Sequence, residues 1–110
     1  MTPKRKIDES SGNVFEDLGL PDSDELLAKA ELARRISEIV RGRRLTQQQA
    51  ARVLGTTQPN VSNLINGRLT GLSLERLVRY LNALGRDVEI VVKRKPRTRD
   101  RSRLKVDVAG

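Results

Sequence analysis

The sequence predicts a mainly helical domain, a bundle of four to five helices, followed by one β-strand near the C-terminus. Between about residues 23 and 84, apolar residues recur every three or four positions, which is the spacing of a helix face. Residues 87–93 instead place Val88, Ile90 and Val92 at every second position, which is the spacing of a strand. With 110 residues, of which 36% are hydrophobic, the chain has room for one domain.

The first helix is expected to begin at Asp22 or Ser23, either of which can cap it, and to end at Gly42. Its apolar residues form a stripe that is expected to face the core. That stripe comprises Leu26, Ala30, Ala33, Ile36 and Val40, widened by Leu32 and Ile39.

Two short helices follow. Thr46 and Gln49 form a capping box, which predicts a helix that stops at Gly55. Thr57 is expected to cap the next helix, which ends at the pair Asn66-Gly67. The four cap and stop signals therefore divide residues 46–67 into two short helices joined by a turn.

A fourth helix is expected to begin after Ser73 and to end at Gly85. The strand after it places Val88, Ile90 and Val92 on one face. Because a single strand leaves its N–H and C=O groups unpaired, it needs a partner. Pairing with the same strand of a second copy, across a two-fold axis, satisfies both chains. The alternative is a partner within the chain, either residues 104–108 or residues 14–15.

Three regions differ in charge. Residues 1–22, with a net charge of −2, are expected to form a flexible arm that contains a short apolar segment. Residues 23–93 form the folded domain, and residues 94–110 form a basic flexible tail. Residues 93–110 alone carry a net charge of +6. The basic surplus favours a polyanionic partner, and the tail from Lys93 to Lys105 is expected to lie over phosphates.

The composition excludes several classes of function. The chain has no cysteine and no histidine, so the commonest metal ligands and the commonest general base are missing. We expect no enzymatic activity, no cofactor and no metal site. No apolar run approaches the roughly 18 residues of a membrane span, so a soluble cytoplasmic protein is expected. Phe15 and Tyr80 are the only aromatic residues, and the core is expected to be aliphatic.

The two short helices fit the spacing of a helix-turn-helix. Two helices that cross at a wide angle over a tight turn need a small residue at the crossing and a glycine in the turn. Counting from Gln47, Ala51 falls at the fifth position and Gly55 at the ninth. Val61 and Leu64, at the fifteenth and eighteenth, are expected to hold the second helix on the core.

Residues 46–67 resemble the helix-turn-helix of the phage repressor and Cro class, the XRE family, which has the lambda-repressor-like fold. The resemblance implies that Gln47 holds a phosphate, and that Gln58 and Asn63 reach base edges of double-stranded DNA. It also implies that the Asn66-Gly67 pair lies against the sugar-phosphate backbone. Pro59 departs from the polar residue often found at its position.

The outward residues of the second short helix agree with this resemblance. Asn and Gln pair bidentately with adenine, and Ser donates or accepts a hydrogen bond. In another interpretation, short amides only decorate and cap a surface helix. The predicted base-reading residues are Gln58, Asn60, Ser62 and Asn63. The predicted phosphate contacts are Gln47, Thr57, Asn66, Arg68, Arg43, Arg44 and Arg52.

The pattern over residues 13–95 is similar to that of the HigA-type antitoxins. The segments that carry this similarity are 13–20, 28–32, 72–77 and 83–90. It implies a homodimer that represses its own operon and neutralises a RelE/HigB-like RNA-cleaving toxin. A dimer would read a pseudo-palindrome with half-sites about 34–36 Å apart. The alternative is a stand-alone regulator with no toxin partner.

Overall fold

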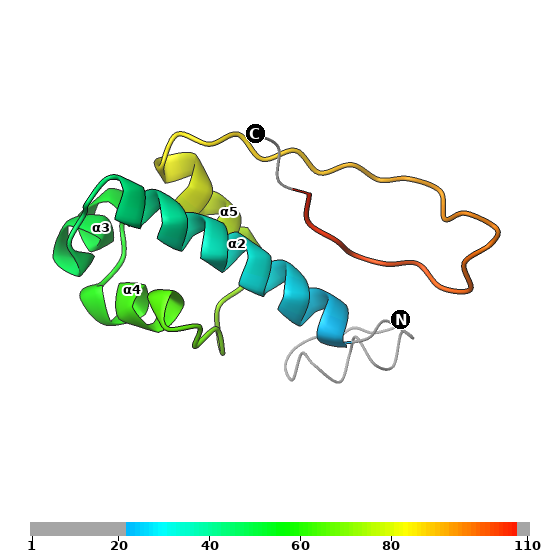
Figure 1. Cartoon of the computed structure of the whole chain (residues 1–110), viewed down its shortest axis with the longest axis horizontal. Helices are drawn as coiled ribbons and strands as arrows, with labels where there is room; N and C mark the ends of the chain where they lie inside the picture. The colour runs from blue at the N-terminus through cyan, green and yellow to red at the C-terminus, as the bar shows by residue number, and fades with distance from the viewer. Residues whose placement is uncertain (1–21, 108–110) are drawn as a thin grey trace.

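A computed structural model describes residues 22–107, and its regular structure is entirely helical. Four helices follow one another along this part of the chain: α2 (Asp22–Gly42), α3 (Gln47–Leu54), α4 (Gln58–Ile65) and α5 (Leu74–Ala83). Figure 1 shows the long α2 crossing the molecule, with α3 and α4 at one end of its long axis. The predicted mainly helical fold is confirmed, with four helices in this part of the chain and no support for a fifth.

The core lies where the four helices meet. Both α2 and α3 pack against α4 and α5. Ile36 of α2, Val61 of α4 and Leu77 of α5 are almost completely buried, and Leu84 at the end of α5 closes the same cluster. All four helices therefore share one core, so the orientation of each depends on the others.

The predicted helix starts are confirmed in detail. The hydroxyl oxygens of Thr46, Thr57 and Ser73 each accept a hydrogen bond from the backbone N–H three residues later, at 3.0, 3.3 and 3.1 Å. At Thr46 the bond is reciprocal, because Gln49 Oε1 accepts from the Thr46 N–H at 2.9 Å. These caps satisfy backbone donors that have no partner inside their helices.

The first helix ends at Gly42 as predicted, but the left-handed residue after it is Arg44, at φ 57°. There the N–H of Leu45 donates back to the carbonyl of Val40 at 3.1 Å and closes the helix end. Gly85 fulfils the expected role after α5, at φ 81°.

Two predictions about the core are wrong. Leu26 and Ala30, assigned to the core-facing stripe of the first helix, are exposed. The N-terminal half of α2 extends beyond the other helices (Figure 1), so they do not cover it. The core is also not purely aliphatic, since Tyr80 is 4% exposed and packs within it.

The predicted strand does not form within residues 22–107 of the single chain. Val88 packs against the core, whereas Ile90 and Val92 are 83% and 91% exposed. A strand needs a hydrogen-bonded partner, and the described part of the chain supplies none to residues 87–93. The alternative partners at residues 14–15 lie outside the described residues, as do most of the predicted N-terminal arm and the last three residues.

Residues 86–107 form an extended C-terminal arm. It leaves the end of α5, turns near residues 97–101 and returns towards the start of α2 (Figure 1). The Leu104 N–H donates to Asp24 Oδ2 at 3.3 Å and connects the returning part to α2. None of the helices in residues 22–107 combines the length and apolar content that a membrane span needs.

The shared core gives a stability prediction. Leu77→Ala removes a fully buried side chain that α2 and α3 pack around, so it should lower the free energy of unfolding by about 2–5 kcal/mol. Leu27→Ala is the matched control, because Leu27 is 68% exposed. It should change that free energy by no more than about 0.5 kcal/mol. Urea unfolding followed by circular dichroism measures both, and equal effects of the two substitutions would contradict this packing.

Candidate nucleic-acid interface

The turn between α3 and α4 has the geometry that the spacing predicts. Gly55 lies in the left-handed region, at φ 72° and ψ 37°. The N–H of Thr56 donates back to the carbonyl of Ala51 at 2.9 Å, which ends α3 after two turns. A Cβ at Gly55 would meet no atom within 4 Å, so glycine is required for its backbone conformation and not for space.

The helix α4 is oriented by two side chains. Val61 and Leu64 are 1% and 3% exposed, and both belong to the core. Pro59 lies in the first turn of α4, where its missing N–H removes no helical bond. With these residues fixed, the predicted outward face is confirmed as a surface. Gln58, Asn60, Asn63 and Asn66 are exposed, and Ser62 is half-buried.

The polar side chains of α4 differ in how many hydrogen bonds they already make within the protein. Asn60 Nδ2 donates to Thr56 Oγ1 at 2.9 Å. Asn66 Nδ2 donates to the carbonyl of Ser62 at 2.8 Å and to its hydroxyl at 3.3 Å. Gln58 makes no side-chain hydrogen bond to another described residue, so both ends of its amide are available.

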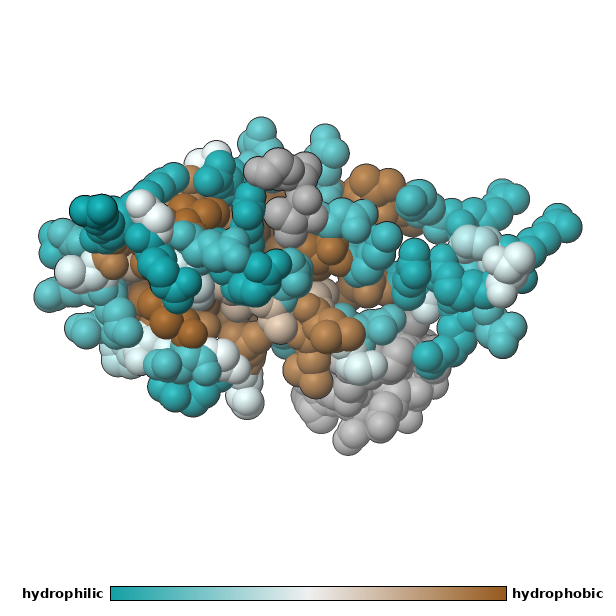
Figure 2. Space-filling model, in the orientation of Figure 1, coloured by the Kyte–Doolittle hydropathy of each residue, from teal (hydrophilic) through white to brown (hydrophobic). Residues whose placement is uncertain are grey.

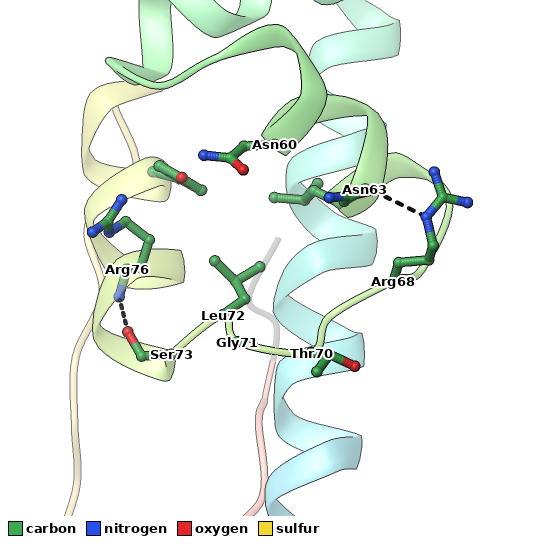
Figure 3. Close-up of a pocket in the computed structure, with 10 residues that line it drawn as sticks. Asn60, Asn63, Arg68, Thr70, Gly71, Leu72, Ser73 and Arg76 are labelled. Atoms are coloured by element: carbon green, nitrogen blue, oxygen red, sulfur yellow. Dashed lines mark hydrogen bonds between the residues drawn. The ribbon is translucent and has the colours of Figure 1, made fainter. Parts of the chain in front are cut away.

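Asn63 is connected to Arg68, which follows the helix. Arg68 Nε donates to Asn63 Oδ1 at 3.0 Å (Figure 3), and the Arg68 N–H donates to the Asn63 carbonyl at 2.8 Å. An amide oxygen has two lone pairs, so Asn63 keeps one of them, together with its NH₂ donors. A predicted base-reading residue and a predicted phosphate contact are therefore held together by a direct bond.

The start of α3 supplies the other polar groups. Gln49 is occupied by the capping box, which leaves Gln47 and Gln48 at the helix N-terminus. Free N–H groups and the helix dipole attract anions at this end of a helix. Gln47 is half-buried, and Thr57, the cap of the next helix, is exposed.

The predicted arginine contacts lie in different surroundings. Arg44 and Arg52 are exposed, the first on the turn before α3 and the second on α3 itself. Arg43 Nη2, by contrast, donates to the carbonyl of Leu84 at 2.6 Å, in a partly buried position. That bond joins the ends of α2 and α5, so Arg43 has a structural contact that its position in the sequence does not reveal.

The structure adds residues that sequence reasoning missed. A hollow of about 160 Å³ lies between α4, residues 68–73 and the start of α5, and Figure 3 shows Asn60 and Asn63 on one side and Arg76 on the other. Thr70 and Ser73 also line it. A signal was present at Arg76: a cation in the first turn of a helix opposes the dipole, which disfavours it unless it has another role.

Together these residues form a polar, positively charged surface. It carries amide and hydroxyl groups on α4, arginines on both sides and two helix N-termini. Base edges are recognised by amides in the major groove, and phosphates by cations and free N–H groups.

A family model described as a helix-turn-helix domain matches residues 14–93. A solved structure whose name assigns it to the XRE family of transcriptional regulators is 46% identical to this chain. It superposes with a TM-score of 0.76 over 81% of this chain and 100% of its own. The chain belongs to the XRE family of helix-turn-helix proteins. None of the curated proteins compared with this XRE-family protein matches it. Membership of the family agrees with the position of Ala51, Gly55, Val61 and Leu64 in the core and the turn.

Proposed function

We propose that this XRE-family protein is a transcriptional regulator that binds double-stranded DNA in a sequence-specific manner. The exposed amide face of α4 is the observation that carries the proposal. An α-helix fits the major groove, where each base pair presents a distinct set of donors and acceptors. The solved relative named as a transcriptional regulator supports the same conclusion.

Within this proposal, the residues divide into two groups. Gln58, Asn60, Ser62 and Asn63 face bases, with Gln58 and Asn63 as the main readers. The Gln58 amide makes no hydrogen bond to another described residue, and the bond from Arg68 holds the Asn63 amide while leaving both of its N–H donors free. The remaining residues contact the phosphates of the DNA backbone and thereby position α4. They are Gln47, Thr57, Asn66, Arg68, Arg44 and Arg52, together with Arg43 through the donors that Leu84 does not use.

Base reading by α4 can be tested with single substitutions. Gln58→Ala and Asn63→Ala should each reduce the preference for a duplex from the gene's own promoter over a scrambled duplex by about 1–3 kcal/mol. Fluorescence anisotropy with both duplexes at one salt concentration measures this preference. Arg52→Ala is the control, because loss of a phosphate contact should weaken both complexes equally. If both amide variants keep the full preference, α4 does not read bases.

We also propose a homodimer, formed by backbone pairing of residues 88–92 with the same residues of a second copy. Ile90 and Val92 are exposed, and no backbone hydrogen bond within the described residues joins residues 87–93 to another segment. Unpaired extended backbone with apolar side chains favours pairing with another chain. A two-fold axis suits a pseudo-palindromic operator with half-sites about 34–36 Å apart.

The dimer predicts a change of mass. At tens of micromolar, the protein should have twice its chain mass of 12.3 kDa by size-exclusion chromatography with light scattering. Ile90→Pro removes an N–H that the pairing needs and should give the monomer. Ile90→Val keeps that N–H and should leave the dimer intact. A monomeric wild-type protein, or a dimeric Ile90→Pro variant, would contradict the pairing.

A second candidate function is that of an antitoxin, which represses its operon and neutralises a RelE/HigB-like toxin. The observation that favours it is the exposure of Leu26 and Leu27 on the part of α2 that extends away from α4. Exposed apolar side chains at such a place can bind a protein while α4 contacts DNA. The alternative remains a stand-alone regulator.

Co-expression decides between the two. If a neighbouring gene encodes a small toxic protein, this chain should restore growth, and Leu27→Glu should weaken the rescue without changing DNA affinity. The matched control is Glu75→Gln, on the exposed face of α5, which should rescue growth fully. A neighbour that is not toxic, or toxicity that this chain does not relieve, would leave the protein a stand-alone regulator.

A further inference from the structure

The C-terminal arm has two limbs that run in opposite directions. Residues 86–96 lead away from α5, the chain turns near residues 97–101, and residues 102–107 return. The limbs exchange no backbone hydrogen bond within the described residues, and the Arg99 N–H to Pro96 carbonyl bond, at 3.2 Å, lies in the turn. In Figure 1 the turn of the arm lies at the opposite end of the molecule from α3 and α4.

The cations of the arm follow a regular pattern. Between residues 93 and 105, every odd position is lysine or arginine, and Arg94 adds one more. Side chains two residues apart on an extended chain lie on one face, about 6.6 Å from each other. The limbs therefore carry rows of cations on one face. Lys93 and Lys95 lie on the outgoing limb and Arg103 and Lys105 on the returning limb, while Arg97, Arg99 and Arg101 lie at the turn between them.

This charge is largely uncompensated. Lys93, Arg94, Arg97 and Arg103 form no ion pair with a carboxylate of the described residues, and residues 93–107 carry a net charge of +6. The arginines on the helices are different, as Arg34 pairs with two glutamates of α2. The pKa of Arg34 is raised by its hydrogen bond to Glu31 and by the charges of both glutamates.

We propose that the arm is a second DNA-binding surface, which holds the phosphate backbone of a duplex segment other than the one that α4 contacts. Duplex DNA carries one negative charge per about 1.7 Å of axis, so each cation of a row can find a phosphate. Because the proposal assigns the cations of the arm to phosphates, binding by the arm is expected to be independent of sequence. Residues 86–107 also contain no asparagine or glutamine, the side chains that pair with adenine. The proposal does not depend on base reading by α4.

The residues between the cations favour DNA over a folded protein as the partner. Near the turn they are Pro96, Thr98, Asp100 and Ser102, which offer no aromatic or large apolar anchor. Figure 2 shows the same distribution: the far end of the arm is mainly hydrophilic, and the hydrophobic patches lie closer to the helices. Five of the eight cations are arginines, whose forked donors match phosphate oxygens.

The salt dependence of DNA binding tests whether the arm contacts phosphates. With an unrelated duplex, the slope of log Kobs against log salt should become shallower by up to about 2.7 when three cations are neutralised, since each phosphate contact contributes about 0.9. The arm variant carries Lys93→Gln, Lys95→Gln and Arg103→Gln. A control removes the same charge from side chains that glutamates already pair with: Arg34→Gln, Arg35→Gln and Arg79→Gln.

The control should keep the wild-type slope, and both variants should keep the wild-type melting temperature because these side chains lie outside the core. An unchanged slope in the arm variant would overturn the proposal, even if Gln58→Ala and Asn63→Ala lose sequence preference as expected. Polyglutamate is a second probe. If the wild-type protein binds polyglutamate more tightly than the duplex at the same salt concentration, and the arm variant loses that binding, the proposal is overturned and the partner is an acidic protein.

A cleavage map tests which DNA segment the arm touches. The chain has no cysteine, so Thr98→Cys gives a single attachment point for an iron–EDTA reagent at the turn of the arm. On a long promoter fragment, this reagent should cut outside the region that the protein protects through α4. The same reagent at Thr70→Cys, beside α4, should cut inside that region. Cleavage by the Thr98→Cys conjugate inside the protected region, or none at all, would contradict a second duplex segment.

Discussion

The burial of Val61 and Leu64 is the interaction on which the rest of this structure depends. α4 has eight residues, and isolated helices shorter than about 12–15 residues are marginal in water. Its stability therefore comes from packing against α2 and α3 and from the Thr57 cap. Since these two side chains face the core, the helix can turn only one face outwards, and that face carries amides and a hydroxyl. The buried residues of α4 thus fix its orientation, and the residues between them form the surface proposed to contact DNA.

Local features of the fold were predictable because local chemistry determines them. Caps at Thr46, Thr57 and Ser73 are formed by a side chain and a backbone N–H three residues apart, so a short window of sequence contains the whole interaction. The left-handed turn at Gly55 is equally local. The core positions Ala51, Val61 and Leu64 followed from the same spacing and needed no knowledge of the remaining chain.

Features that depend on distant parts of the chain could not be predicted in this way. The burial of Tyr80 and the exposure of Leu26 depend on how far each helix is covered by others. The Arg43 bond to Leu84 spans 41 residues, and Arg76 meets the polar face of α4 only through the bend at residues 68–73. Alternation at residues 87–93 correctly indicated extended backbone, but a strand also needs a partner, and alternation does not provide one. Of the candidate site, the outward face of α4 was therefore predictable, and its hydrogen bonds and the neighbouring hollow were not.

The two ends of the molecule carry two different polar surfaces. At one end, α3 and α4 combine polar side chains of defined direction with helix N-termini, which suits a surface that distinguishes one sequence from another. At the other end, the arm presents cations with few counter-charges and no asparagine or glutamine. Amide chemical-shift changes on titration with a promoter duplex test the placement of the reading surface most directly. The largest shifts should lie at the start of α3, along α4 and in residues 68–76. Binding that leaves the amides of α4 unshifted would contradict it.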